Sequence, residues 1–249
     1  MLNIYDELTY RKENGIKSFA VLIDPDKVIQ QSLLNIIQLS NENDVDFFFV
    51  GGSLLNKDNI TEVVKFIKSN SEIPVILFPS NSSQIVEEAN GILFLSLISG
   101  RNPDYLIGQQ VISAPILAQT NLEVLSTGYM LVDCGSQTTA SYISNTNPLP
   151  YNKPEIAVAT ALAGEMIGMK LIYADGGSGA DTHISPQMIS AISKNIKIPL
   201  IVGGGLRNVE SVIQAWNSGA DLAVVGNFIE KSPEFISELN QHRKLIIKD

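Results

Sequence analysis

Short and nearly continuous runs of apolar residues recur along the chain, and most of them end in Asp, Gly or Ser. Runs that lack polar alternation indicate strands buried on both faces, which is typical of parallel sheets. Because both faces of such a sheet must be covered, the segments between the runs are expected to be helices. The predicted strands are Ser18–Ile23, Asp46–Val50, Pro74–Phe78, Ile92–Leu97, Tyr129–Val132, Lys170–Ala174, Pro199–Val202 and Asp221–Val225.

Apolar residues at helical spacing separate these strands. The predicted helices are Val28–Leu39, Ile60–Ile67, Ile156–Ile167, Met188–Ile192, Val209–Trp216 and Phe235–Leu239. The segment Ile156–Ile167 is so apolar that we expect it to be largely buried. Eight strands alternating with helices over 249 residues predict an α/β chain with one domain, residues 1–249, folded as a modified (β/α)₈ TIM barrel. A doubly wound open sheet is the alternative.

Two segments do not fit the alternation. Arg101–Thr127 contains two prolines and a central glycine and shows no clean helical period. Thr138–Pro150 looks extended and loop-like. We expect these segments to replace a barrel helix or to decorate the catalytic face.

Charge and cysteine usage exclude several classes of protein. The formal net charge is −9, and no basic block occurs. Since neutralisation of phosphates drives nucleic-acid binding, we expect no nucleic-acid partner. A single cysteine, Cys134, excludes an intramolecular disulfide and fits a reducing, cytoplasmic location. The longest apolar run, Gly91–Ile98, is far shorter than the roughly 20 residues that span a bilayer.

Glycine and small polar residues dominate the positions just after the predicted strands, where TIM barrels carry their reactive groups. Gly203-Gly204-Gly205 follows the seventh strand, and Gly226-Asn227 follows the eighth. Ser178-Gly179 lies after the sixth. Turns of this kind let backbone N–H groups approach an anion, because no Cβ stands in the way. The combination predicts a phosphate-binding barrel.

Two carboxylates follow predicted strands. Asp24 ends an apolar strand, where a free carboxylate is costly unless it is paired or bound to a cation. Mg²⁺ bridging to a diphosphate would account for it, and the hydroxyl of Ser53 after the second strand could add a ligand or cap a turn. Asp26 could instead cap the helix predicted from Val28. Asp175 is suited to act as the base that takes the proton of a substrate hydroxyl. The nearby Tyr173 either faces the phosphate or fills the core.

Several motifs resemble one enzyme family. They are LIDPDK (22–27), VGGS (50–53), YADGGSGA (173–180), VGGGL (202–206) and VGNFI (225–229). In order and spacing they are similar to the geranylgeranylglyceryl phosphate synthase family, which includes bacterial heptaprenylglyceryl phosphate synthases. SNTNPLP (144–150) and ATALAGE (159–165) resemble the longer, second group of that family.

The resemblance implies a Mg²⁺-dependent, cytoplasmic prenyltransferase of ether-lipid synthesis. It would join sn-glycerol 1-phosphate to geranylgeranyl or another polyprenyl diphosphate, with Asp24 and Ser53 as metal ligands and Asp175 as catalytic base. The family usually has Glu where Asp175 stands, so the contact of this shorter side chain with the glycerol hydroxyl must be rebuilt or bridged by water. The implied glycerol phosphate-binding residues are Tyr173, Ala174, Asp175, Gly176, Gly177, Ser178, Gly179, Gly204, Gly205, Gly226 and Asn227.

The resemblance also bears on the prenyl tail and on partners. Leu97–Ile116 is the candidate wall of an apolar groove. Aligned by the SGRNPDY segment, Tyr105 occupies the position that sets tail length in the family, and a tyrosine favours a C20 tail. A homo-oligomer, either a dimer or a hexamer, is expected, as is transient membrane contact for the lipid product.

Two other functions compete with this interpretation. One is another phosphate-binding TIM-barrel enzyme, an isomerase or lyase acting on a sugar phosphate, although no second well-placed base is evident. The other is a non-catalytic lipid-phosphate binding protein, which would not need a carboxylate such as Asp24 beside a phosphate site.

Overall fold

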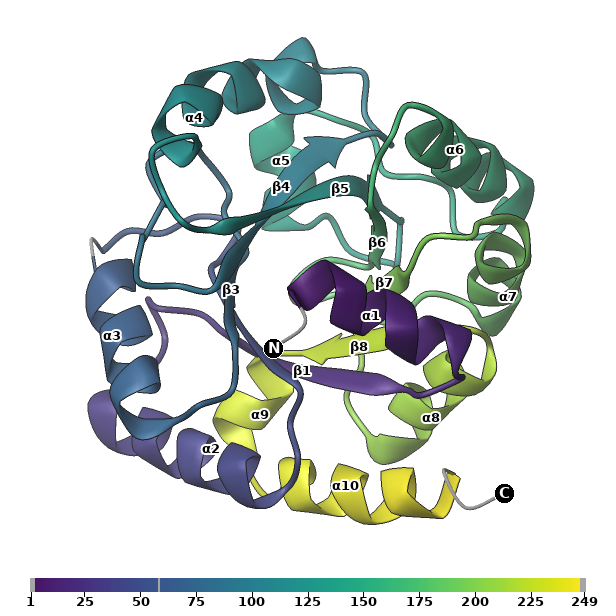
Figure 1. Cartoon of the computed structure of the whole chain (residues 1–249). Coiled ribbons are helices and arrows are strands. Elements are labelled where there is room, and N and C mark those ends of the chain that lie inside the picture. The colour runs from purple at the N-terminus through teal and green to yellow at the C-terminus, as the bar shows by residue number, and fades with distance from the viewer. Residues whose placement is uncertain (1–2, 58, 247–249) are drawn as a thin grey trace.

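The computed structural model describes residues 3–57 and 59–246 and contains a closed barrel of parallel strands (Figure 1). Each strand pairs with the next along the chain, and the last pairs with the first, so the predicted TIM barrel is confirmed. The strands are β1 (Ser18–Ile23), β2 (Phe47–Val50), β3 (Val75–Leu77), β4 (Gly91–Leu97), β5 (Glu123–Leu131), β6 (Leu171–Asp175), β7 (Leu200–Gly203) and β8 (Leu222–Val225).

A ring of helices surrounds the barrel (Figure 1). The ring consists of α2 (Gln30–Glu42), α3 (Ile60–Asn70), α4 (Gln109–Leu117), α6 (Pro154–Met166), α7 (Pro186–Asn195), α8 (Val209–Asn217) and α10 (Phe235–Ile246). Shorter helical segments are η1 (Asp104–Gly108), a π-helix that leads into α4, together with α5 (Thr139–Ser144) and α9 (Asn227–Lys231). Between β3 and β4 the described chain crosses in turns and loop, without a helix.

The missing barrel helix therefore lies between β3 and β4. Arg101–Thr127, expected either to replace a barrel helix or to decorate the catalytic face, does not replace one. That segment forms η1 and α4, and Thr138–Pro150, expected to be a loop, contains α5. The helical period of α4 was hidden because its inner face is polar, with Gln110 and Ser113 buried. Its large apolar side chains Val111 and Ile112 point outward instead and are exposed.

β5 begins at Glu123, six residues before the strand predicted at Tyr129. Polar residues interrupt the apolar run in this part of the chain and concealed the strand. Thr127 is nevertheless buried, and its hydroxyl donates to the carbonyl of Leu125 at 2.7 Å. A satisfied hydroxyl of this kind can lie in a barrel core at little cost.

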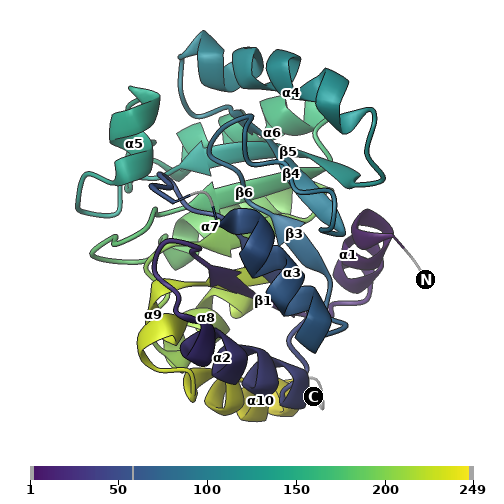
Figure 2. The ribbon, with the colours of Figure 1, turned by 90° about the vertical axis from the view of Figure 1, so that its left-hand side faces the viewer.

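Helix α1 (Ile4–Glu13) was not predicted and lies across one end of the barrel, opposite the end that carries α5 (Figures 1 and 2). Ile4 and Leu8 pack against the side chains of the barrel interior. The carboxylate of Glu123 accepts hydrogen bonds from the backbone N–H groups of Ile4 and Tyr5, at 2.5 and 2.8 Å. α1 thus closes the N-terminal end of the barrel and leaves the C-terminal end open.

The expectation that Ile156–Ile167 is largely buried is wrong. In α6 only Ala157, Ala161 and Gly164 are buried, because the helix touches the barrel along one narrow stripe. Met166 and Ile167 are 80% and 69% exposed. Cys134 is buried in the core. Among the described residues, no helix is both long enough and apolar enough to cross a membrane.

Candidate active site

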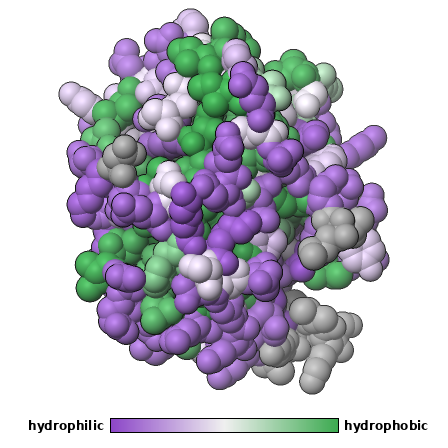
Figure 3. All heavy atoms as spheres, turned by 60° about the vertical axis from the view of Figure 1, so that its left-hand side comes forward, coloured by the Kyte–Doolittle hydropathy of each residue, from purple (hydrophilic) through white to green (hydrophobic). Residues whose placement is uncertain are grey.

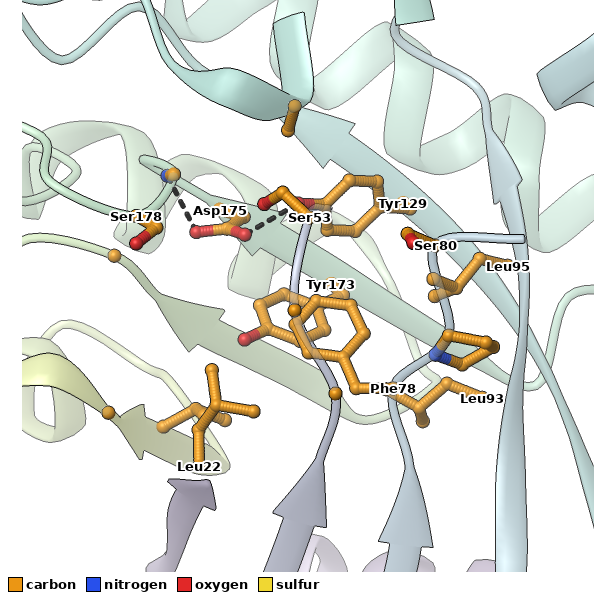
Figure 4. A pocket seen from close by; sticks show the side chains of 18 of the residues that line it. Leu22, Ser53, Phe78, Ser80, Leu93, Leu95, Tyr129, Tyr173, Asp175 and Ser178 are labelled. Atoms are coloured by element: carbon orange, nitrogen blue, oxygen red, sulfur yellow. Dashed lines mark hydrogen bonds between the residues drawn. The ribbon is translucent and has the colours of Figure 1, made fainter. Parts of the chain in front are cut away.

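A cavity of about 580 Å³ opens at the C-terminal ends of the strands. Its polar side is formed by the turns after β6, β7 and β8, and its apolar side by β4, α4 and the loop after β3. Figure 4 shows Asp175 and Ser178 on one side of the cavity and Leu95 on the other. One cavity therefore joins a polar site to an apolar groove.

The turns after β6 and β7 depend on glycine. Gly177, Gly179, Gly204 and Gly205 have φ angles of +86°, +83°, +77° and +72°, a region that L side chains rarely adopt. A Cβ on Gly204 would lie 2.5 Å from the backbone N of Gly177 and 2.6 Å from Asp175 Oδ1. The four glycines, together with Gly226-Asn227 after β8, let the backbone reach the cavity, which is the arrangement of an anion-binding cradle.

Asp175 is the last residue of β6 and is buried beside this cradle. The Tyr129 hydroxyl donates to Oδ2 at 2.5 Å, and the Gly177 N–H donates to Oδ1 at 2.7 Å. Both carboxylate oxygens are thereby held in place, as the dashed lines in Figure 4 show. The bond to Tyr129 orients the carboxylate and leaves its remaining lone pairs for a substrate hydroxyl.

Burial raises the pKa of Asp175 above that of a free aspartate, while the hydrogen bonds from Tyr129 and Gly177 partly offset the rise. Burial likewise raises the pKa values of Tyr129 and Tyr173 far above that of a free tyrosine, and the charge of Asp175 adds to the effect. The two phenols therefore stay neutral near pH 7. A buried carboxylate with a raised pKa and one free side is suited to accept a proton.

Three aromatic rings form the floor beneath Asp175. The ring of Phe78 stacks on Tyr173 with centroids 5.1 Å apart, and Tyr129 meets Tyr173 edge to face at 5.5 Å. Tyr173 therefore belongs to the core and also lines the cavity. The three rings thus pack against one another and fill this part of the barrel interior.

Asp24 and Ser53 both line the cavity, at the ends of β1 and β2. Asp24 Oδ2 lies 2.7 Å from Lys27 Nζ, and Oδ1 accepts the N–H of Asp26 at 3.1 Å. Ser53 does not cap the next helix, because α3 begins at Ile60 with Asn59 as its N-cap. In the described part of the chain, no group of three or more His, Cys, Asp or Glu residues could hold a metal ion.

Asp26 does not cap a helix either, since α2 begins only at Gln30. Its carboxylate instead accepts hydrogen bonds from the backbone N–H groups of Asn56 and Lys57, at 2.6 and 3.0 Å. These contacts tie the loop after β2, which carries Ser53, to the loop after β1. Asp26 thus helps to hold Ser53 near Asp24.

Side chains also connect the metal-ligand candidates to the cradle. Lys27 Nζ donates to Asn227 Oδ1 at 3.0 Å, and Asn227 Nδ2 donates to Ser178 Oγ at 2.9 Å. With the Asp24–Lys27 ion pair, these contacts form one continuous chain across the mouth of the cavity. It joins the ends of β1, β8 and β6.

The groove of the cavity runs along η1 and α4, and most of its apolar side chains come from β4. Tyr105, Gln109, Ser113 and Leu117 recur every four residues along it, so that they form one stripe roughly 18 Å long. Tyr105 belongs to η1. The hydroxyl of Ser96 donates to the carbonyl of Leu106 in η1 at 2.7 Å and so supports the geometry of this segment. The candidate wall predicted at Leu97–Ile116 is therefore in place, with Tyr105 at one end of the stripe.

The structure gathers most of the predicted site residues around one cavity, with two exceptions. Ala174 points its side chain into the outer core, and Gly176 turns behind the cradle with its N–H bonded to the carbonyl of Gly203. Sequence reasoning missed Tyr129 and Lys27. Tyr129 pairs with Tyr173 in the ladder between β5 and β6, and only the register between these two strands could have indicated its contact with Asp175.

Known proteins resemble this chain over nearly its whole length. The PcrB family matches residues 9–243. The chain is 52% identical over 228 residues to a geranylgeranylglyceryl phosphate synthase of Spirosoma linguale, covering 92% of each chain. It is 49% identical to the enzyme of that name from Chitinophaga pinensis, covering 95% of this chain and 94% of the other.

Solved structures also resemble this chain. The crystal structure of (S)-3-O-geranylgeranylglyceryl phosphate synthase from Thermoplasma acidophilum with sn-glycerol 1-phosphate has a TM-score of 0.91 at 29% identity, covering 98% of this chain and 100% of the other. A tryptophan synthase α-subunit from Pyrococcus furiosus shares only the fold, with a TM-score of 0.56 at 14% identity over 93% of this chain and 98% of the other.

Proposed function

This chain belongs to the PcrB family, and we propose that it joins sn-glycerol 1-phosphate to geranylgeranyl diphosphate, or to another polyprenyl diphosphate, releasing diphosphate. It is a prenyltransferase of ether-lipid synthesis. The observation that carries the proposal is the single cavity in which a glycine cradle, a buried base and an apolar groove meet. Each part suits one portion of the two substrates.

The cradle would bind the glycerol phosphate through the turns at 177–179, 204–205 and 226–227. With the phosphate held there, the C3 hydroxyl would reach toward Asp175, the carboxylate beside the cradle. Asp175 would accept the hydroxyl proton as the oxygen attacks C1 of the prenyl chain and the bond from C1 to the diphosphate breaks. Tyr129 would keep the carboxylate oriented, and the fixed position of the nucleophile lowers the barrier.

A Mg²⁺ ion is compatible with Asp24 and Ser53. Mg²⁺ usually binds one or two carboxylates together with substrate phosphates, so a complete protein cage is not required. Asp24 already attracts one cation, Lys27, and its neighbour Ser53 offers a hydroxyl on the same cavity wall. When bound, the ion would neutralise charge on the diphosphate and so make it a better leaving group.

Replacing Asp24 with Asn tests this assignment. We expect turnover to fall by on the order of 100-fold at limiting Mg²⁺ and to recover partly at high Mg²⁺, because a neutral ligand binds the ion more weakly. The measurement is the rate of product formation across a Mg²⁺ titration. Asp133→Asn, an exposed carboxylate at the same end of the barrel, is the control. An unchanged Mg²⁺ dependence in Asp24→Asn would remove Asp24 from the metal site.

We also propose that the prenyl tail lies along the groove beside α4 and that Tyr105 limits its length. The aromatic ring takes up volume in this groove. Tyr105→Ala should therefore raise the use of donors longer than C20 relative to C20, since truncation opens space along the wall. The measurement is product mass from an equimolar mixture of C15 to C35 diphosphates. An unchanged distribution of products would rule out Tyr105 as the limit.

Two surface features support further proposals about partners. Ile156 and Met166 on α6, and Ile167 directly after it, are exposed, which suits a homo-oligomer, either a dimer or a hexamer. Apolar atoms also gather over α4, in the upper part of the face seen in Figure 3. Ile107 of η1 and Val111 of α4 are exposed. This face lies on the outer side of the helix that borders the tail groove, which suits transient contact with a membrane that takes up the lipid product.

The proposed reaction is tested by incubating the protein with sn-glycerol 1-phosphate, geranylgeranyl diphosphate and Mg²⁺ and measuring the ether product by mass. We expect product from the sn-1 isomer and none from the sn-3 isomer or in EDTA. Turnover of a sugar phosphate in place of this product would favour an isomerase or lyase. Phosphate binding without turnover of any donor would favour a lipid-phosphate binding protein.

A further inference from the structure

Lys27 lies between the two halves of the site, and no role follows for it from the reaction as described. Its Nζ is 2.7 Å from Asp24 Oδ2, where the diphosphate would bind, and 3.0 Å from Asn227 Oδ1, in the cradle proposed for glycerol phosphate. An ammonium group has three N–H donors, and these two partners use two of them. The third remains for a bound anion.

The negative charges around the cavity would repel the two anionic substrates unless a cation lies close to them. Three carboxylates line it, namely those of Asp24, Asp175 and Glu230. Burial raises the pKa of Glu230, whereas the nearby charge of Lys27 lowers it. A phosphate monoester adds a charge of about −1.5 to −2 near pH 7, and a diphosphate must bind next to it. Two adjacent anions repel each other strongly in a partly buried site.

Among the described residues that line the cavity, two are basic, Arg207 and Lys231, and both are less well placed than Lys27 to contact the two anions. Arg207 also lines the cavity, but its guanidinium donates to the backbone carbonyl of Ala180 in the turn after β6. Lys231 lies at the end of α9, one helical turn beyond Asn227. Lys27 is the lysine whose ammonium group touches both Asp24 and the cradle. Its side chain is 46% exposed, so it can shift toward a ligand without breaking a packed core.

We propose that Lys27 binds both substrates at once, with its ammonium group between the phosphate of glycerol 1-phosphate and the diphosphate of the prenyl donor. Lys27 then reduces the repulsion between the two anions and couples their binding. This inference rests on the proposed function, because it takes the identities of the two anions from it. The alternative is a purely structural role, in which Lys27 only neutralises Asp24.

The test is calorimetric binding of sn-glycerol 1-phosphate in metal-free buffer without donor. Lys27→Met keeps most of the length of the side chain and removes the charge. We expect its affinity to fall by about 10- to 100-fold, the range for a hydrogen bond to a charged group. Lys57→Met removes a charge from the neighbouring loop, where Nζ contacts the carbonyl of Asp26 at 3.1 Å, and should change affinity by no more than about threefold. Lys27→Arg should restore part of the loss.

A double variant separates contact from neutralisation. In Asp24→Asn/Lys27→Met the carboxylate that Lys27 pairs with is itself neutral. If Lys27 contacts the phosphate, the double variant stays weak. If Lys27 only neutralises Asp24, the double variant binds glycerol phosphate like the wild type, which overturns the proposal. Thermal melting of each variant confirms that it is folded.

Coupling is measured by repeating the titrations with inorganic diphosphate and Mg²⁺ present. Diphosphate should weaken glycerol phosphate binding more in Lys27→Met than in the wild type, since the charge between the anions is gone. Equal weakening in both proteins would contradict the bridging position. A wild type that forms product while Lys27→Met binds normally overturns this inference alone. A wild type that neither binds glycerol 1-phosphate nor forms product overturns the proposed function.

Discussion

Asp175→Asn should lower kcat by about 10²- to 10⁴-fold, the usual contribution of a general base, while leaving the fold intact. The amide can still accept the Gly177 N–H and can donate to the Tyr129 hydroxyl, so the two contacts of the carboxylate have replacements. Because burial raises the pKa of Asp175, the ionised form destabilises the folded state as pH rises through that pKa. The neutral variant should therefore melt at or above the wild-type temperature near pH 7.

The pH profile distinguishes a base from a mere binding group. kcat of the wild type should fall as pH drops through the raised pKa of Asp175, since the protonated carboxyl cannot accept a proton. Tyr129→Phe removes a hydrogen bond that lowers this pKa, so the acidic limb should move to higher pH. Asp175→Glu keeps a carboxylate and should retain turnover. A kcat for Asp175→Asn within a few-fold of the wild type would contradict the assignment.

Gly204→Ala should have the second-largest effect, acting on stability and on phosphate binding together. The left-handed backbone costs a β-carbon about 1–2 kcal/mol, and the close contacts with Gly177 and Asp175 add about 1–3 kcal/mol. Moving these groups also distorts the cradle and the base. Affinity for sn-glycerol 1-phosphate, measured by calorimetry, should fall more than tenfold, in line with a lost charged hydrogen bond.

Two other glycines provide matched controls. Gly15 has φ of +70°, close to that of Gly204, and a Cβ there meets no atom within 4 Å, so Gly15→Ala should cost only the backbone strain. Gly179 has φ of +83° and equally open surroundings, but it lies in the cradle. Gly179→Ala should thus match Gly15→Ala in melting temperature and bind phosphate less well. Equal phosphate affinities in the Gly179 and Gly204 variants and the wild type would disprove the cradle.

The barrel could be predicted because its strands are buried on both faces and therefore read as uninterrupted apolar runs. The polar residues that end those runs then share one end of the barrel, which placed Asp24, Asp175 and the glycine turns together before any coordinates. The carboxylates, the glycine turns and the order of the strands all indicated a site at the C-terminal ends of the strands. Local patterns of this kind can be recognised in a single sequence.

Other features depend on packing that the sequence pattern does not carry. α1 packs only Ile4 and Leu8 into the barrel, too few apolar positions to form a clear period. α4 turns Gln110 and Ser113 inward, where the Gln110 amide donates to the carbonyl of Leu95 and the Ser113 hydroxyl donates to the carbonyl of Gln109, so its inner face has no apolar period. The partnership of Tyr129 with Asp175 depends on the register between β5 and β6, which pairs Tyr129 with Tyr173 and which the pattern within either strand does not specify.

The account is tested most directly by a crystal structure of this protein with sn-glycerol 1-phosphate. We predict that the phosphate contacts the turns at 177–179, 204–205 and 226–227, with the C3 hydroxyl within hydrogen-bond distance of Asp175 and Lys27 Nζ on the phosphate. A phosphate bound elsewhere in the cavity, or a C3 hydroxyl directed away from Asp175, would contradict the account.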